Sequence, residues 1–225
     1  MLELYQDYLN NRGFRVTMKS FDTNGAFADN YKFLIGSILP RPIAVVSTLN
    51  ENGTNNVAPF SFFTAVSASP MIVAFCPMIR SATGMMKDTP RNIFREKEFV
   101  INIASEGIIE KINMTSTELP YGEDEFVLSG LTPIDSEKIK AKRVKECLIH
   151  FECIYRDHLS YGDKPGAGMI ITGEVVKVHI AEEILEDHRI ITKKLKPVGR
   201  GVGNDYFRCD DTFELSRLMK AQIQK

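Results

Sequence analysis

Hydrophobic and β-branched residues fall into short runs from residue 41 onward. The runs are separated by Gly, Pro and Asn, and they predict strands at residues 43–49, 55–63, 64–68, 71–76 and 98–104. Two longer runs, 147–159 and 168–180, predict a strand pair joined by a Gly-rich turn. Short strands at this spacing are typical of a β-barrel or sandwich. They do not alternate with long helices, which argues against a doubly wound parallel sheet.

Helical patterns are fewer and shorter. Thr89 is a good N-cap residue and Pro90 suits the first helical position, so a helix is expected from there to about Lys97. Further helices are expected at residues 2–11, 105–114 and 181–194, and a short strand at 14–20. Two stretches are expected mainly as loops, 115–142 and the Gly-rich 197–209. The first is long enough to suggest a lid or a subunit contact.

Composition narrows the class of protein. The chain has 225 residues, of which 44% are hydrophobic and 25% charged, which fits one globular domain over 1–225 with an N-terminal extension at 1–20. A net charge of -1 argues against a strongly basic nucleic-acid binder. The N-terminus lacks a secretion signal, and no apolar run reaches the ~18 residues that a membrane helix needs. We therefore expect a cytoplasmic protein with no membrane partner.

Sequence motifs for common chemistries are absent. The chain has no P-loop, no GxGxxG, no HExxH and no GxSxG, and its histidines are scattered. The four cysteines lack CxxC spacing, which argues against a zinc site and favours buried, reduced thiols. We therefore predict no catalytic side chain and no metal ligand.

Two segments offer binding chemistry instead. Residues 56–63 mix small, amide and hydroxyl residues with aromatics, so their backbone groups can approach a flat heterocycle such as an isoalloxazine ring. Lys87, Thr89 and the free N–H groups of the following helix form a plausible anion site, suited to a phosphate. The alternative is that the first segment is only a core strand pair and the second only a well-capped surface helix.

These segments also carry a resemblance to a known family. The pattern RPIAVVST, then NVAPFSFF, then KDTPRNI is similar to the flavin reductase-like family of FMN-binding split barrels. That family includes flavin reductase components of two-component monooxygenases and flavoredoxin-type electron carriers. HFEC at 150–153 and GEVVKVHI at 173–180 continue the likeness, which covers about residues 25–218. The loop at 199–203 departs from it, because the family more often has a shorter loop there.

The resemblance implies a mainly β fold, a Greek-key split β-barrel with a few peripheral short helices. It also implies a homodimer with FMN bound noncovalently near the subunit interface. The cofactor-binding residues implied are Ser47, Thr48, Asn56, Ala58, Phe60, Ser61, Phe62, Arg80, Lys87, Asp88, Thr89 and Asn92. Of these, one of Phe60 and Phe62 is expected in the core, and Asn92 could only brace the helix start.

The activity that the resemblance implies is NAD(P)H-dependent reduction of flavin by hydride transfer to its N5 atom. Such chemistry belongs to the cofactor and needs no protein nucleophile. One alternative is a flavoredoxin-type electron-transfer protein with tightly bound FMN and no direct nicotinamide site. Another is a split-barrel binding module without redox activity. A monooxygenase or other redox partner is possible in the first two cases.

Overall fold

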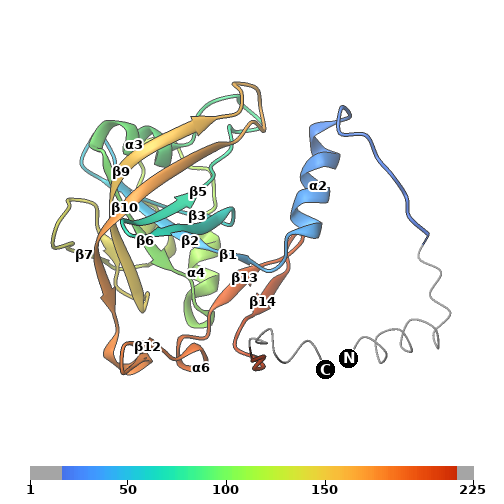
Figure 1. Cartoon of the computed structure of the whole chain (residues 1–225). Helices are drawn as coiled ribbons and strands as arrows, with labels where there is room; N and C mark the ends of the chain where they lie inside the picture. Colours follow the sequence, from blue (N-terminus) through green and yellow to red (C-terminus); the bar gives the residue numbers. More distant parts are fainter. Residues whose placement is uncertain (1–16, 217–225) are drawn as a thin grey trace. The chain divides into compact units, whose positions relative to one another are not determined.

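The computed structural model of the chain describes residues 17–216 (Figure 1). The chain divides into two compact units, one up to residue 34 and one from residue 35 onward, and each is described by itself. The helix expected at 2–11 lies outside the described residues, and residues 17–20 of the expected strand at 14–20 form no strand. Helix α2 (Phe27–Ser37) was not predicted. No helix of residues 17–216 is long and apolar enough to cross a membrane.

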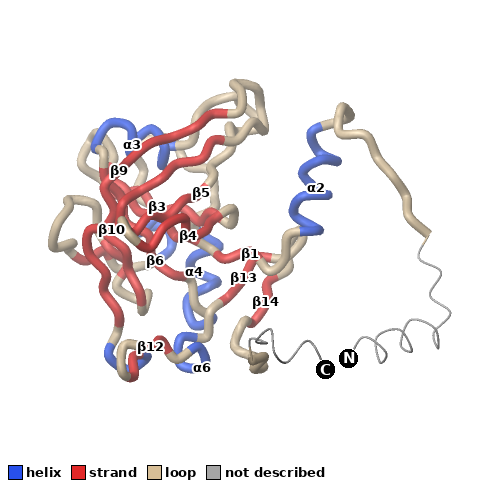
Figure 2. Tube along the Cα trace, in the orientation of Figure 1, coloured by secondary structure: helices blue, strands red, loops and turns tan. Residues whose placement is uncertain are grey.

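One large antiparallel sheet dominates the second unit (Figure 2). It has seven strands in the order β3-β2-β6-β9-β10-β5-β4. Its strands are β2 (Ala44–Leu49), β3 (Asn55–Phe60), β4 (Phe63–Ala68), β5 (Met71–Phe75), β6 (Glu98–Ile103), β9 (Ile149–Ser160) and β10 (Met169–Ile180). A strand is present at each position predicted from residue 43 to 180, but the strand expected at 55–63 ends at Phe60, and Phe63 begins β4. Although β3 and β4 follow each other in the chain, they form the two opposite edges of this sheet. The predicted fold class, a mainly β split barrel, is confirmed.

Both faces of β2 are buried. Val46 faces a core that contains Phe75 and Phe99, whose ring centroids are 5.6 Å apart. Val45 faces a second core with Phe126, beneath the short helices α4 (Ile109–Met114) and α5 (Glu125–Ser129). Successive residues of a strand point to opposite faces, so a run of apolar residues is what a strand buried on both sides requires.

The helices differ more from prediction. Helix α3 (Asp88–Glu96) was expected, but its N-cap is Lys87, which makes no side-chain cap bond, so the assignment of Thr89 as the N-cap is wrong. The 3₁₀ turn η1 (Glu106–Ile108) and α4 fill the helix expected at 105–114. The stretch 115–142 holds α5 and β7 (Pro133–Ile134), which pairs with β8 (Arg143–Val144).

The helix expected at 181–194 is wrong. The segment contains the 3₁₀ turn η2 (Glu182–Ile184), the hairpin β11 (Leu185–Glu186) and β12 (Arg189–Ile190), and α6 (Thr192–Leu195). Asp187 and His188 at the hairpin turn have φ of 43° and 64°. This left-handed conformation cannot continue a right-handed helix.

A second, three-stranded sheet is formed by β1 (Arg41–Pro42), β13 (Val198–Arg200) and β14 (Tyr206–Arg208). The Gly-rich stretch 197–209 is thus a hairpin rather than a loop. The buried guanidinium of Arg41 donates to the carbonyls of Ile35 and Gly201, both at 2.6 Å, and to Ser61 Oγ at 3.3 Å. Arg41 therefore joins this sheet to the turn after β3.

Gly173 in β10 marks a close approach in the core. A methyl group there would lie 2.4 Å from the ring of Phe99 and 3.1 Å from Cys153. We expect Gly173→Ala to destabilise the protein by about 1–3 kcal/mol, because overpacking a rigid core forces its neighbours to move. Urea unfolding measures this, with Gly36→Ala in α2 as the matched control, because a methyl group there would meet no atom of the described residues within 4 Å apart from its own helix and its chain neighbours. Equal stabilities of the two variants would contradict the prediction.

Candidate functional site

A small pocket lies between β3, the start of α3 and the loop at 115–119. Its volume is about 70 Å³. It brings together six of the predicted site residues, namely Asn56, Ala58, Arg80, Lys87, Asp88 and Thr89. Pro59, the loop at 115–119 and Glu125 complete the wall, and sequence reasoning did not name them as site residues. The length of the stretch 115–142, which suggests a lid or a subunit contact, is a partial indication of this role.

Two cations in this pocket lack full compensation. Arg80 Nη2 donates to Asp88 Oδ2 at 3.1 Å, but the buried Nε–H of Arg80 has no hydrogen-bond partner among the described residues. Glu118 Oε1 lies 3.9 Å from this Nε, too far for a hydrogen bond. Burial lowers the pKa of Lys87, an effect that Glu118 opposes. An unpaired buried donor is costly. A negatively charged hydrogen-bond acceptor in the pocket would therefore be favourable.

The first turn of α3 adds backbone donors to the same wall. The N–H groups at the start of a helix have no partner within the helix and lie at the positive end of its dipole. In α3 these donors come from Asp88 and Thr89, because Pro90 has no N–H. Anions bind readily at such a helix end when cationic side chains stand beside it.

Three carboxylates also face the pocket, and their states matter for an anion. Asp88 is already paired with Arg80, and Glu118 is 59% exposed, so it can turn toward water. The third, Glu125, is buried, and this burial raises its pKa. Each carboxylate is thus neutralised, solvated or easier to protonate than usual. A group of phosphate size fits this pocket better than a cation does.

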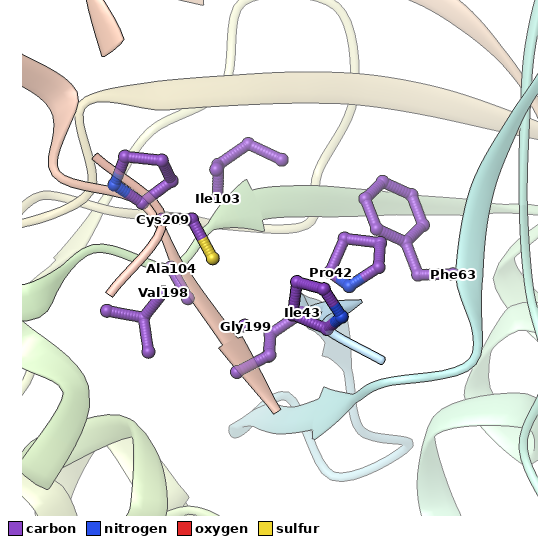
Figure 3. Close-up of a pocket in the computed structure, with 10 residues that line it drawn as sticks. Pro42, Ile43, Phe63, Ile103, Ala104, Val198, Gly199 and Cys209 are labelled. Carbon is purple, nitrogen blue, oxygen red and sulfur yellow. The ribbon is translucent and has the colours of Figure 1, made fainter. Parts of the chain in front are cut away.

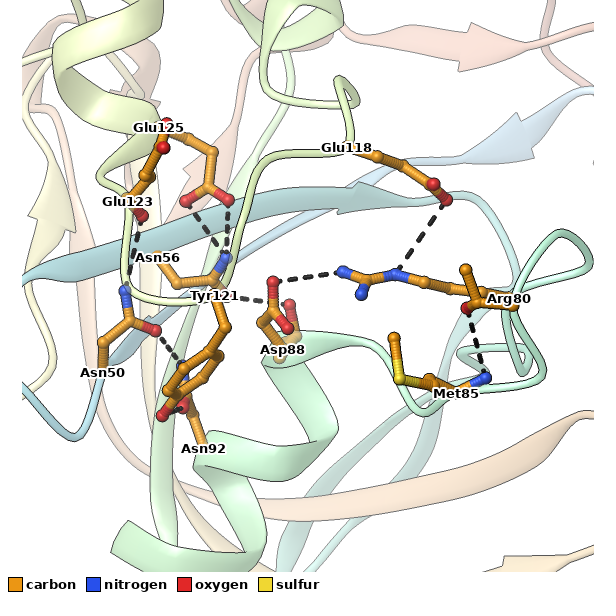
Figure 4. A network of polar contacts seen from close by, with 12 residues as sticks. Asn50, Asn56, Arg80, Met85, Asp88, Asn92, Glu118, Tyr121, Glu123 and Glu125 are labelled. Carbon is orange, nitrogen blue, oxygen red and sulfur yellow. Dashed lines mark hydrogen bonds and ion pairs between the residues drawn. The ribbon is translucent and has the colours of Figure 1, made fainter.

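A buried hydrogen-bond network supports the pocket from behind (Figure 4). Asn56 Oδ1 accepts from Thr48 Oγ1 at 3.0 Å and from Thr89 Oγ1 at 2.9 Å. Asn56 Nδ2 donates to both oxygens of Glu125, at 3.0 and 3.1 Å, while Asn92 Nδ2 donates to Thr48 Oγ1 at 3.0 Å. Thr48, Thr89 and Asn92 are each at most 1% exposed. They position Asn56 and the start of α3.

The edge of β3 leads away from the pocket. The N–H groups of Asn55 and Val57 point outward from the sheet, to Asp124 and Glu125, at 3.1 Å each. Since outward positions alternate along an antiparallel strand, the backbone of Pro59 also points outward, and it has only a carbonyl to offer. This edge can pair with the N–H of a flat heterocycle.

The residues after Pro59 divide between core and surface. The side chain of Phe60 is 6% exposed and packs on Phe75 at a centroid distance of 5.0 Å, so Phe60 is the core member of the aromatic pair. Ser61 and Phe62 are half-buried in the turn that follows. Arg41 fixes this turn by donating to Ser61 Oγ.

Ser47 lies away from the pocket. Its Oγ donates to the carbonyl of Lys142 at 2.5 Å and accepts from Asn102 Nδ2 at 3.2 Å. Thr48, the next residue, faces the pocket wall, so Ser47 must face the opposite side of β2. The resemblance grouped the two residues, but the alternation of the strand separates them.

The side of the sheet that carries Ser47 holds a buried histidine. His150 Nδ1 lies 2.8 Å from Asn102 Oδ1, which also accepts from the N–H of Val144. Asn102 Oδ1 can only accept, so Nδ1 carries the proton. Burial lowers the pKa of His150 from 6.5 to about 4, and the positive charge of Arg143 adds to the effect.

This histidine makes stability depend on pH. Folded His150 stays neutral while the unfolded chain takes up a proton near pH 6.5, so its contribution is complete above pH 6.5 and is lost as the pH falls toward about 4. We expect a loss of up to about 3 kcal/mol over this range. Urea unfolding at several pH values measures it, and His150→Gln should flatten the profile. The same slope in both proteins would contradict the prediction.

Several solved structures share the fold of this chain. In the crystal structure of nitrilotriacetate monooxygenase component B from Bacillus cereus, the chain is 38% identical to this one, with a TM-score of 0.84 and coverage of 88% of this chain and 99% of that one. The 2-nitrobenzoate 2-nitroreductase NbaA of Pseudomonas fluorescens is 25% identical, with a TM-score of 0.81 and coverage of 90% and 98%. Flavoredoxin of Desulfovibrio vulgaris (Miyazaki F), at 22% identity and a TM-score of 0.67 over 82% and 93% of the chains, shares the fold.

Sequence comparison identifies the family of this chain. The uncharacterized protein YwrF of Bacillus subtilis is 36% identical over 193 residues, which cover 84% of this chain and 93% of YwrF. The family model named Flavin reductase like domain matches residues 35–195, from the end of α2 to the end of α6. The match includes β2, β3 and the start of α3, which together build the pocket. The chain therefore belongs to the flavin reductase like domain family.

Proposed function

We propose that this chain binds FMN and acts as an NAD(P)H-dependent flavin oxidoreductase. The observation that carries the proposal is the buried Arg80 Nε–H, which has no acceptor within residues 17–216 and lies beside Lys87 and the first turn of α3. A phosphate supplies what these donors lack. The volume of about 70 Å³ supports a single phosphate group, which favours FMN over a dinucleotide.

Different residues would bind the phosphate and the ring of the flavin. Arg80, Lys87 and the peptide N–H groups of Asp88 and Thr89 would hold the phosphate. The backbone of β3 and of the turn at 61–62 would hold the ring by its polar edge. The buried Asn56 would hold the phosphate site at α3 in a fixed position relative to β3, since it hydrogen-bonds to Thr89 on α3 and to Glu125 beside the strand edge.

Once bound, the flavin would supply the acceptor for a hydride from the nicotinamide. The chain's part is to bind and to orient. Burial of the phosphate strengthens its contacts with Lys87 and Arg80, because charges attract more strongly away from water. The rigid network behind the pocket fixes the anchor, which limits the positions that the ring can take along β3.

We include a second copy of the chain in the proposal. The pocket has a volume suited to a phosphate but not to a ring system, so the ring would lie beside Pro59, beyond the part of the β3 edge that Asp124 and Glu125 occupy. A homodimer that covers this edge would shield the ring from water. The likeness to a monooxygenase component B supports a separate oxygenase as the redox partner.

Anaerobic mixing of the FMN-loaded protein with NADH or NADPH tests the proposal. We expect the yellow colour to bleach rapidly with at least one of the two nicotinamides. A flavin that stays oxidised with both, and is reduced only by a reduced partner protein, would contradict the oxidoreductase and favour a flavoredoxin-type carrier. Free FMN at the same concentration is the control for direct reduction.

A further inference from the structure

A second, apolar cavity of about 220 Å³ lies where β1 and β13 meet β4 and the end of β6. Its walls come from five separate stretches of the chain, and they include Pro40, Pro42, Phe63, Ile103, Val198 and Cys209 (Figure 3). The sulfur of Cys209 points into the hollow. No charged side chain lines the cavity in the part of the chain that the structure describes.

The walls of this cavity are stiff. Three of the lining residues are prolines, whose rings cannot turn into the empty space. Arg41, between Pro40 and Pro42, is clamped by carbonyls of Ile35 and Gly201 at 2.6 Å each. At Gly199 any side chain would lie 2.8 Å from Pro40 Cβ and 3.3 Å from Cys209 Sγ. The hollow is therefore built in and does not depend on a movable side chain.

The size and lining of the cavity define what it can hold. An engineered apolar cavity of about 150 Å³ binds benzene. A hollow of about 220 Å³ has room for one or two fused rings. A charged group would lose its water without gaining a partner, which is unfavourable. Flat apolar rings match the faces of Phe63 and the prolines.

We propose that this cavity binds an uncharged aromatic ring of up to indole size. The site is separate from the phosphate pocket, and its walls include neither Lys87 nor Arg80. It adjoins the turn at 61–62 through the hydrogen bond from Arg41 to Ser61. The proposal goes beyond flavin binding and stands whether or not the chain holds a flavin.

The two half-exposed thiols provide an internal test on the full-length protein. Cys209 lines the cavity and Cys76 does not, while Cys147 and Cys153 are buried. With 5-fluoroindole at about four times its Kd, alkylation of Cys209 by iodoacetamide should slow about fivefold, because only a fifth of the sites stay empty. The rate at Cys76 should not change. Mass spectrometry of the modified peptides gives both rates.

Fluorine NMR of the same probe checks the site without the thiol chemistry. The 5-fluoroindole signal should shift or broaden with the wild type and with Cys209→Ser, which keeps the space. It should not respond to Cys209→Phe, which fills it. The charged analogue 5-fluoroindole-2-carboxylate should bind at least about tenfold more weakly.

Several results would overturn the proposal. One is a wild-type protein that neither shifts the fluorine signal nor protects Cys209. Another is equal binding by Cys209→Phe. A third is Cys209 that resists alkylation in the protein alone, since another segment or a second copy would then fill the cavity.

Discussion

Asn56→Leu is expected to destabilise the protein by about 3–5 kcal/mol. Leucine has nearly the shape of asparagine, but it leaves the hydroxyls of Thr48 and Thr89 without their acceptor and removes two hydrogen bonds from the buried Glu125. Each buried polar group left unpaired costs about 1–3 kcal/mol, and more when the group is charged. The loss is measured as the change in the free energy of unfolding in urea.

The matched control for this prediction is Asn204→Leu. Asn204 is exposed in the hairpin between β13 and β14, so its replacement should change stability by less than about 0.5 kcal/mol. If Asn56→Leu cost less than about 1 kcal/mol, the network would not hold β3 and α3 together as described.

Lys87→Ala is expected to weaken FMN binding about 10- to 150-fold. The Lys87 ammonium is partly desolvated, and a charge-assisted hydrogen bond from it to a phosphate contributes about 1.5–3 kcal/mol. Lys87→Glu should cost at least about tenfold more, because repulsion replaces attraction. Quenching of flavin fluorescence on titration gives the Kd values.

Riboflavin, which lacks the phosphate, makes this test specific. The wild type should bind FMN more tightly than riboflavin, and the difference should shrink in Lys87→Ala. The exposed Lys193→Ala in α6 serves as the control and should behave as the wild type. A Lys87→Ala variant that loses affinity for FMN and riboflavin equally would place Lys87 away from the phosphate.

The strands were predictable because buried strands produce short apolar runs in the sequence. A strand inside the sheet needs apolar residues on both faces, as in β2, and turns between strands need residues such as Gly53, which has a φ of 84°. The segment 181–194 misled because its apolar residues, spaced as in a helix, in fact belong to a hairpin and two short turns. Asp and His take positive φ more often than most residues, but the sequence of Asp187 and His188 does not require it.

The site was predictable only in part. Lys87, Asp88 and Thr89 stand together in the sequence, so their grouping required no tertiary information. Glu125 and the loop at 115–119 lie far from Lys87 in the sequence, and only the folded chain brings them to the pocket. No periodic pattern in the sequence predicts their position. Ser47 and Thr48 show the limit of a motif, since adjacent residues of one strand face opposite sides.

The visible spectrum of the purified protein tests the central claim most directly. The protein is incubated with FMN, freed of unbound flavin by gel filtration, and compared with Lys87→Glu treated in the same way. We predict that the wild type keeps the yellow absorbance of one flavin per chain and that the variant loses it. A wild-type protein that emerges colourless would contradict the assignment of the pocket to a flavin phosphate.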